Sequence, residues 1–271
     1  MPNHVRNIIS FSKEVPEERI HALFDYMKTE DPDSGEVQFD FDKLIPMPKA
    51  LLVDATVDCK EALILYKGCN LANLSTTEKS ELRKQVVSSH YMDMLVKQTL
   101  GDTSSNYLQK QLNDTNGDIF RIMKKTAAGE KLYAKGEAAY NNIKLYGATS
   151  WYDWRCQNWG TKWNSYEVSF DEGGRQIGFN TAWSCPVPVI EKLSQVFPDI
   201  PFILDYADED FGSNAGQIEY DGKDFRHFEY EYNSPEACEA YVNIWGTSSC
   251  FYQDDDGTWH RYSCENCPNP C

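Results

Sequence analysis

The sequence has little that would place it in a membrane or send it out of the cell. No run of about 18 apolar residues occurs along its 271 residues, which argues against a membrane-spanning helix. The opening stretch MPNHVRNIISFSKEV lacks the long apolar segment and small-residue cleavage site of a secretory signal. We therefore expect a protein that makes no contact with a membrane and stays in the cytoplasm where it is made.

Catalytic motifs are also scarce. The sequence contains no G-x-x-x-x-G-K-[ST], G-x-G-x-x-G, H-E-x-x-H or G-x-S-x-G pattern, so neither a phosphate-binding loop nor a hydrolase motif is indicated. A cysteine nucleophile would require Cys156 or Cys185 to meet His227 in space, which spacing along the chain does not test. We expect a protein that is not an enzyme. An uncharacterised enzyme with a pocket of cysteine, histidine and acidic residues stays as an alternative.

Basic residues are nearly absent from one part of the chain. Residues 199–256 contain 15 Asp and Glu against Lys223 and Arg226, in a protein of formal net charge −16. Residues 60–145, by contrast, hold 13 Lys and Arg against nine acids. Nucleic-acid binding requires a basic footprint, which this total disfavours, whereas a basic protein surface would be attracted. The opposite charges of the two parts also favour a homo-oligomer, although acids can simply maintain solubility.

The residues that we expect to bind a partner lie in this acidic part, where carboxylates alternate with aromatic side chains. Acids steer a basic partner toward a surface, and aromatic rings anchor it there. The predicted partner-binding residues are Asp208, Glu209, Asp210, Glu229, Glu231, Asp254, Asp255, Asp256 and Trp259.

Hydrophobic periodicity predicts an α+β fold. The stretch VRNIIS reads as a strand, and VQFDFDKLI alternates as a half-buried strand. A helix follows Pro16, with an apolar stripe of Ile20, Leu23, Phe24 and Met27. Gly160 is expected to end a second helix, and Ser234 to be the N-cap of a third. Residues 58–146 are rich in helix formers, with Ser75 and Glu78 forming a capping box. A hairpin around Gly173 and Gly174, a helix and two strands come next. This order predicts a split βαβ antiparallel sheet with helices on one side.

Five stretches together carry a resemblance to a known family: MPNHVRN, FDFDKLIPMP, WYDWRCQNWGTKW, FNTAWSCPVPVI and YADEDFGSNAGQIEYDG. They resemble the YubB ferredoxin-like, or Api-like, domain family of phage and plasmid proteins. The resemblance implies a ferredoxin-like core over residues 1–57 and 147–222, a large helical insertion at 58–146, and an origin in a mobile genetic element. Residues 223–271 then form a small C-terminal α/β extension with a cysteine-rich tail. The family carries no catalytic residues to transfer.

Four of the chain's seven tryptophans lie in WYDWRCQNWGTKW, residues 151–163. Such large side chains can join two parts of a fold, with each indole N–H on a partner. They can equally form a platform on which bases or a peptide stack, with cationic neighbours contributing. Exposure of an indole face to water would favour the second interpretation. The residues of this aromatic segment are Trp151, Trp154, Arg155, Trp159 and Trp163.

The C-terminal tail supplies a candidate metal site. His260, Cys264, Cys267 and Cys271 have the spacing H-x3-C-x2-C-x3-C, and three thiolates with one imidazole can hold a tetrahedral zinc ion. Cys250 could replace one of these ligands, and free or oxidised thiols are the alternative. The fold needs no cofactor, so any zinc would be structural.

Together these features predict a cytoplasmic mobile-element protein that inhibits a host protein complex through its acidic surface. An anti-phage defence complex or a complex that handles nucleic acid is the expected partner, because its basic surface would suit such acids. A single-stranded nucleic-acid-binding protein that uses the sheet and the tryptophans is the rival hypothesis. Aromatic residues on the open face of the sheet would favour that rival.

Overall fold

The computed structural model describes residues 3–31, 34–53, 59–88, 118–247, 249–263 and 266–267. They form two compact units. Unit 1 comprises Met1–Pro46 and Arg155–Cys271, and unit 2 comprises Met47–Trp154. The helical unit therefore begins and ends about ten residues outside the predicted 58–146.

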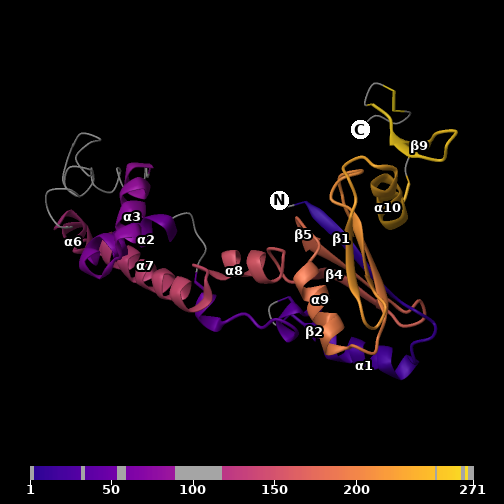
Figure 1. The fold of residues 1–271 in the computed structure, drawn as a ribbon, viewed down its shortest axis with the longest axis horizontal. Helices are drawn as coiled ribbons and strands as arrows, with labels where there is room; N and C mark the ends of the chain where they lie inside the picture. The colour runs from indigo at the N-terminus through magenta and orange to yellow at the C-terminus, as the bar shows by residue number, and fades with distance from the viewer. Residues whose placement is uncertain are drawn as a thin grey trace. The chain divides into compact units, whose positions relative to one another are not determined.

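The centre of unit 1 is a six-stranded antiparallel sheet with the strand order β4-β5-β1-β6-β7-β8 (Figure 1). The first four strands of this order, with α1 after β1 and α9 between β5 and β6, have the ferredoxin-like arrangement and confirm the predicted α+β class. The strands are β1 (His4–Phe11), β4 (Tyr166–Asp171), β5 (Gln176–Ala182), β6 (Phe202–Asp208), β7 (Gly216–Tyr220) and β8 (Phe225–Glu229).

Helices α1 (Glu17–Met27) and α9 (Val187–Val196) bury apolar stripes in unit 1. The stripe of α1 is the one that the sequence predicts, Ile20, Leu23, Phe24 and Met27. The Phe24 ring lies 5.9 Å from that of Phe11 in β1 and 5.2 Å from that of Phe170 in β4. Helix α1 therefore packs on the face of β1 that carries the buried odd-numbered residues.

The other face of the sheet carries α10 (Pro235–Trp245), which starts at the N-cap Ser234 as predicted. Ala237 of this helix packs on Ala207 and Ala215, and the Trp245 indole donates to the Ala207 carbonyl at 3.1 Å. A small hairpin, β9 (Phe251–Gln253) with β10 (Trp259–Arg261), follows the helix (Figure 1).

Two predicted boundaries are wrong. The stretch VQFDFDKLI is a strand only in β3 (Val37–Phe39), which pairs with β2 (Lys28–Glu30) outside the main sheet. A 3-10 turn, Phe41–Lys43, follows because the Asp40 carboxylate accepts the Asp42 N–H and turns the chain. The C-terminal extension also does not start at residue 223, since β8 is the sixth strand of the main sheet.

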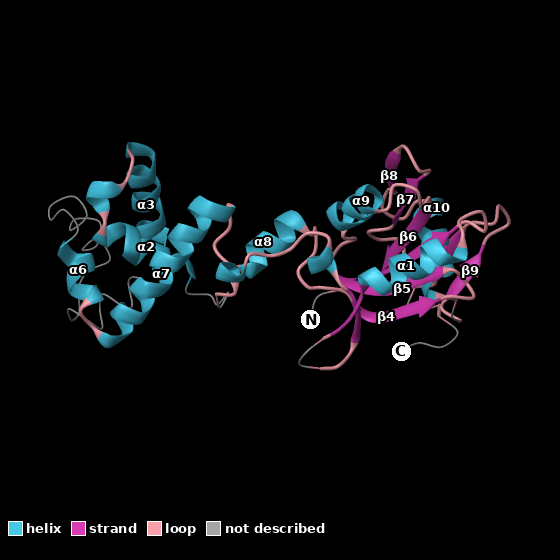
Figure 2. Ribbon diagram, turned by 90° about the horizontal axis from the view of Figure 1, so that it is seen from below, coloured by secondary structure: helices cyan, strands magenta, loops and turns pink. Residues whose placement is uncertain are grey.

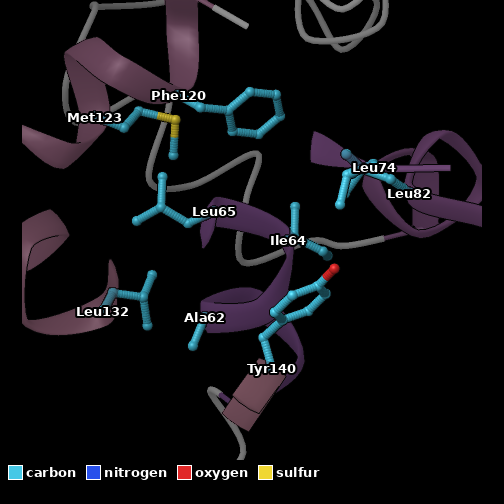
Figure 3. Packing of buried hydrophobic residues seen from close by; sticks show 9 residues of the cluster. All are labelled: Ala62, Ile64, Leu65, Leu74, Leu82, Phe120, Met123, Leu132 and Tyr140. Atoms are coloured by element: carbon cyan, nitrogen blue, oxygen red, sulfur yellow. The ribbon is translucent and has the colours of Figure 1, made fainter. Parts of the chain in front are cut away.

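Unit 2 consists of helices around one apolar cluster (Figure 3). The capping box is confirmed, because the Ser75 N–H and hydroxyl both donate to Glu78 at 2.9 and 2.8 Å. Gly136 lets α2 and α7 approach closely, since a Cβ there would lie 2.0 Å from the Ala62 carbonyl oxygen. The helices, shown in cyan in Figure 2, are α2 (Cys59–Cys69), α3 (Thr76–Ser88), α6 (Asp118–Lys124) and α7 (Ala127–Tyr146), with short 3-10 turns at Lys49–Leu51 and Leu71–Asn73.

Helix α8 (Trp151–Asn158) spans the boundary between the two units, and Gly160, with φ +77°, follows its end as the sequence predicts. Among the described residues, no helix is both long enough and apolar enough to cross a bilayer.

Candidate functional site

Four of the five stretches that carry the family resemblance meet at one edge of the sheet, where β1 begins and β5 and β6 end. We call this group of residues the aromatic–acidic edge. Pairing of His4 with Ala182 on one side and of Val5 with Asp208 on the other brings the stretches together. Its residues are Asn3, His4, Lys162, Trp163, Tyr166, Trp183, Asp208, Glu209, Asp210 and Asn214.

Asp208 is the buried centre of this edge, with 4% of its surface exposed. Its carboxylate accepts hydrogen bonds from Asn3 Nδ2 at 3.1 Å, from the Asp210 N–H at 2.9 Å and from Asn214 Nδ2 at 3.3 Å. A buried carboxylate with three donors holds its surroundings in place. Asp208 therefore positions the edge from within, while the neighbouring Glu209 and Asp210 are exposed.

Trp183 is held at the edge in an uncommon backbone conformation, with φ +74°. Its N–H donates to the Asn3 carbonyl at 2.9 Å, and its own carbonyl accepts from Asn214 Nδ2 at 2.8 Å. A bulky residue rarely occupies this region, and surrounding structure must impose it. The indole is 43% exposed. In the sequence, the one signal at this tryptophan is its place in FNTAWSCPVPVI.

The ammonium group of Lys162 lies within cation–π range of two indoles at this edge. Its Nζ is 4.6 Å from the centroid of Trp163 and 4.9 Å from that of Trp183. The Trp163 ring in turn makes an edge contact with Tyr166 at 6.3 Å between centroids. The edge therefore combines one cation, two indoles and nearby carboxylates.

His4 and Tyr166 form a hydrogen-bonded pair beside the indoles. The Tyr166 hydroxyl lies 2.7 Å from His4 Nδ1 and 3.1 Å from the Thr181 carbonyl. Burial raises the pKa of Tyr166 to about 12, and the charges of Glu167 and Glu209 add to this effect. The phenol therefore stays protonated at neutral pH and serves as a hydrogen-bonding group.

The exposed acids predicted to bind a partner lie next to this edge, on a region that we call the acidic lobe: residues 209–214, β8 and the loop after it, α10 and the hairpin β9–β10. Rings of Phe211, Tyr241 and Phe251 pack together at 4.7 to 5.4 Å and join the loop, the helix and the hairpin. The Asn233 N–H donates to the Gly212 carbonyl at 2.8 Å. The exposed carboxylates of this lobe are Glu209, Asp210, Glu229, Glu231, Glu236, Glu239, Asp255 and Asp256.

Two further predicted residues of the lobe have structural partners. The Asp254 carboxylate accepts from the backbone of Asp256 and Thr258 and pairs with His260 Nε2 at 2.7 Å, which closes the turn of the hairpin. Trp259 is half-buried on β10. Asp255 and Asp256 at the tip of the turn are fully available to a partner.

The pKa values of two tyrosines, Tyr230 and Tyr241, are affected by carboxylates in and beside the lobe. Burial raises the pKa of Tyr230 first, and the carboxylates of Asp205, Glu236, Glu219 and Glu239 raise it further. Burial also raises the pKa of Tyr241, where Asp210 and Glu209 act upward and Arg261 acts downward. Because carboxylates on separate elements act on single side chains, the acids are concentrated in space as well as in sequence.

Within the aromatic segment, the best-defined tryptophan belongs to the core. Trp159 is 1% exposed, donates its indole N–H to the Ile45 carbonyl at 2.9 Å and meets Phe41 edge-on. Arg155 lies 4.7 Å from the Trp159 ring, and burial lowers its pKa. Trp154 is also buried, whereas Trp151 and Trp163 are half-buried. The contacts of Trp159 with Phe41 and Ile45 lie within unit 1, so this tryptophan belongs to the core of that unit. Exposed tryptophans lie outside the segment, at Trp183 and Trp245.

The predicted zinc ligands are only partly described. His260 is paired with Asp254 and stacked on Tyr252, with ring centroids 5.3 Å apart. Cys250 Sγ lies 2.8 Å from Cys267 Sγ. The alternative in which Cys250 replaces one zinc ligand needs these two residues to be close together. Cys264 and Cys271 lie outside the described residues. In the part of the chain that is described, no three His, Cys, Asp or Glu side chains form a metal-binding group.

Cys185, one of the two cysteines considered as a nucleophile, is poorly suited to that role. Burial raises the pKa of Cys185 well above its ordinary value, which disfavours the thiolate. His227 Nε2 instead meets the Tyr206 hydroxyl at 2.9 Å. A cavity of about 470 Å³ lies farther along the sheet, but Arg226 in its lining is paired with Glu219 and Asp221, and no histidine or cysteine lines it.

The face of β1 and β5 that lies opposite helix α1 offers little aromatic surface on which single-stranded nucleic acid would stack, since His4 is the one aromatic side chain that these two strands carry there. On β1 this face carries His4, Arg6, Ile8 and Ser10, and on β5 it carries Gln176, Gly178, Asn180 and Ala182. Arg6 lies across Gly178 and donates to the Glu167 carbonyl at 2.8 Å. Burial lowers the pKa of Arg6, and the Glu167 carboxylate opposes that shift. This charge is therefore already balanced within the sheet.

Comparison with known proteins agrees with the strand order. Residues 158–246 match the family model described as a ferredoxin-like domain in Api92-like protein. This part of the chain is thus similar to a ferredoxin-like domain class. The crystal structure of a protein api92 from Yersinia pseudotuberculosis is 12% identical, covers 85% of this chain and 99% of its own, and has a TM-score of 0.37. No curated protein sequence matches the chain.

Proposed function

We propose that this protein is a non-enzymatic binding protein whose acidic lobe docks on a basic surface of another protein. The observation that carries this proposal is geometric: the Phe211, Tyr241 and Phe251 rings hold together the loop, α10 and the hairpin, and exposed carboxylates lie on all three of these elements. Carboxylates of separate elements that lie close together add their negative potentials. The combined field steers a basic partner toward the lobe and raises its association rate. The aromatic–acidic edge beside the lobe supplies indole surface for anchoring.

The biological setting follows from the resemblance to phage and plasmid proteins. We propose that the partner is a host complex of the bacterial cytoplasm, such as an anti-phage defence complex or one that handles nucleic acid, and that binding inhibits it. Such a complex would offer a basic surface that normally meets phosphates. Self-association through the basic residues of unit 2 is a further proposal, and light scattering at low and high salt would test it.

The test is affinity capture from a host-cell lysate, with and without nuclease, using matched charge variants. Asp255→Asn with Asp256→Asn removes two charges from the acidic lobe, and Glu17→Gln with Glu18→Gln removes two exposed charges from α1. We expect a stoichiometric protein that survives nuclease, binds more weakly as salt rises, and is reduced only by the first variant. Equal capture by both variants, or recovery of nucleic acid alone, would refute the proposal.

Single-stranded nucleic-acid binding remains the second candidate because of the two indoles at the edge, although on the face opposite α1 the only aromatic side chain of β1 and β5 is His4. An enzymatic role has no supporting observation among the described residues. A structural zinc ion on the C-terminal cysteines stays a prediction, with Cys250 and Cys267 as its described members. Metal analysis of the purified protein, compared with a Cys250→Ser variant, would test it.

A further inference from the structure

We propose that Trp163 and Trp183 form a binding site for the cationic side chain of a lysine or arginine of the partner, and that Lys162 occupies this site in the unbound protein. This inference rests on the proposed function, because it names where a basic partner is anchored. The starting observation is that Lys162 Nζ lies within 5 Å of both indole centroids, at 4.6 and 4.9 Å.

Two indoles within this distance attract a cation through the negative faces of their rings. Trp rings give the strongest attraction among aromatic side chains, and paired rings act on the same charge. Lys162 immediately precedes Trp163 in sequence, but Trp183 comes from the end of β5, so the second ring is supplied by the fold. The site therefore depends on how the sheet places Trp183.

The fold fixes Trp183 before any partner arrives. Its backbone is held at φ +74° by the Asn3 carbonyl and by the side chain of Asn214, and Asn214 also donates to the buried Asp208. A strained conformation persists only where neighbouring groups determine it. Because this backbone is already held and the residue is 43% exposed, little backbone entropy is lost when a partner packs on Trp183.

Carboxylates extend the site toward a cation. Asn3, which accepts the Trp183 N–H, donates its side chain to Asp210 at 2.9 Å. The next residue, His4, donates its N–H to Glu209 at 2.9 Å. Asp210 is thus hydrogen-bonded to Asn3, the residue that holds the Trp183 backbone, and Glu209 is hydrogen-bonded to the residue after it. A basic segment of a partner that places one cation on the indoles would therefore find exposed carboxylates among the neighbouring residues.

Lys162 competes with the partner's cationic side chain for the two indoles. A partner cation must displace the Lys162 ammonium group, so part of the binding free energy is spent on this exchange. Removing the ammonium group should tighten binding of a cationic probe by about two- to fivefold, the equivalent of one exposed cation–π contact. Removing Trp183 should eliminate this gain.

The experiment measures binding of hexalysine amide at low salt by calorimetry. It compares wild type with Lys162→Met, Lys192→Met, Trp183→Ala and the double variant Lys162→Met/Trp183→Ala. Lys192→Met is the charge-matched control, because Lys192 lies half-buried on α9, where its ammonium group donates to the side chain of Gln195 at 3.3 Å. Fluorine NMR of 5-fluorotryptophan protein reports on each indole, with Trp163→Phe and Trp183→Phe variants assigning the two signals.

The expected result is tighter binding by Lys162→Met than by Lys192→Met and probe-dependent shifts of both assigned indole signals. In the Trp183→Ala background, Lys162→Met should have an effect no larger than the general charge effect that Lys192→Met gives in the wild type. Equal effects of the two lysine variants, with hexalysine still bound, would overturn the cation site and leave the proposed function standing. Absence of hexalysine binding by wild type and by both lysine variants would overturn the proposed function and this site together. A circular dichroism spectrum of Trp183→Ala that matches the wild type shows that only the site is lost and the fold is kept. Trp183→Phe, which keeps an aromatic ring, should have a smaller effect on binding.

Discussion

Replacing Asp208 with asparagine should destabilise unit 1 by roughly 3 kcal/mol. The carboxylate is 4% exposed and accepts from Asn3, Asp210 and Asn214. A hydrogen bond to a charged group contributes about 1.5–3 kcal/mol, and a buried donor left unsatisfied costs about 1–3 kcal/mol. The asparagine amide keeps one acceptor oxygen but turns an N–H2 group toward at least one donor. One charged bond is lost and one donor is left without an acceptor.

Urea unfolding and hydrogen exchange would measure this loss. With a urea dependence of about 2 kcal/mol per molar, the midpoint should fall by roughly 1.5 M at unchanged slope. Amides of β1 and β6 should lose about 100-fold protection, since 1.4 kcal/mol corresponds to a factor of ten. Asp255→Asn, at the exposed hairpin turn, is the control and should change stability by less than about 0.5 kcal/mol. A change of that small size in Asp208→Asn would refute the structural role of this carboxylate.

Three further predictions concern the helices and titrating groups. Gly136→Ala places a Cβ 2.0 Å from the Ala62 carbonyl oxygen and should cost unit 2 about 2 kcal/mol despite better helix propensity, as thermal unfolding would show. Hydrogen bonds from Ser75 lower the pKa of Glu78 to about 2. The cap therefore stabilises α3 above about pH 4.5, and this stabilisation is lost as the pH falls toward 2. Ser75→Ala should raise the pKa of Glu78 in a carboxyl NMR titration. Tyr166 has a pKa of about 12, raised first by burial, so stability should fall between about pH 10 and 12, and less so in Tyr166→Phe.

Local signals in the sequence were sufficient for the helices and for most strands. The stripe of α1, the Ser75–Glu78 cap and the start of α10 at Ser234 each depend on residues three or four positions apart, which a sequence displays directly. The end of β3 was missed because one side-chain hydrogen bond, from Asp42 N–H to Asp40, outweighs an alternating pattern of apolar residues. A side-chain hydrogen bond that competes with strand pairing in this way cannot be seen in the spacing of apolar residues.

The roles of single acids could not be predicted in the same way. Asp208 lies in an acidic run and reads as a surface residue, yet its partner Asn3 is 205 positions away. Likewise, the residue that pairs with His260 is Asp254, across the hairpin turn, while spacing alone suggested zinc. A charge that is satisfied by distant groups looks identical in sequence to one that faces water, because only the fold brings its donors.

Strand order explains why the aromatic–acidic edge gathers residues from such distant parts of the chain. β1 lies between β5 and β6 and is antiparallel to both, so its first residue sits beside the last residues of its two neighbours. Asn3 is thereby bonded to Trp183 on one side and to Asp208 and Asp210 on the other. Unit 2 enters the chain between β3 and β4 and interrupts none of these pairings. The ferredoxin-like order therefore brings together at three strand ends the amide, the indole and the carboxylates on which the proposed cation site depends.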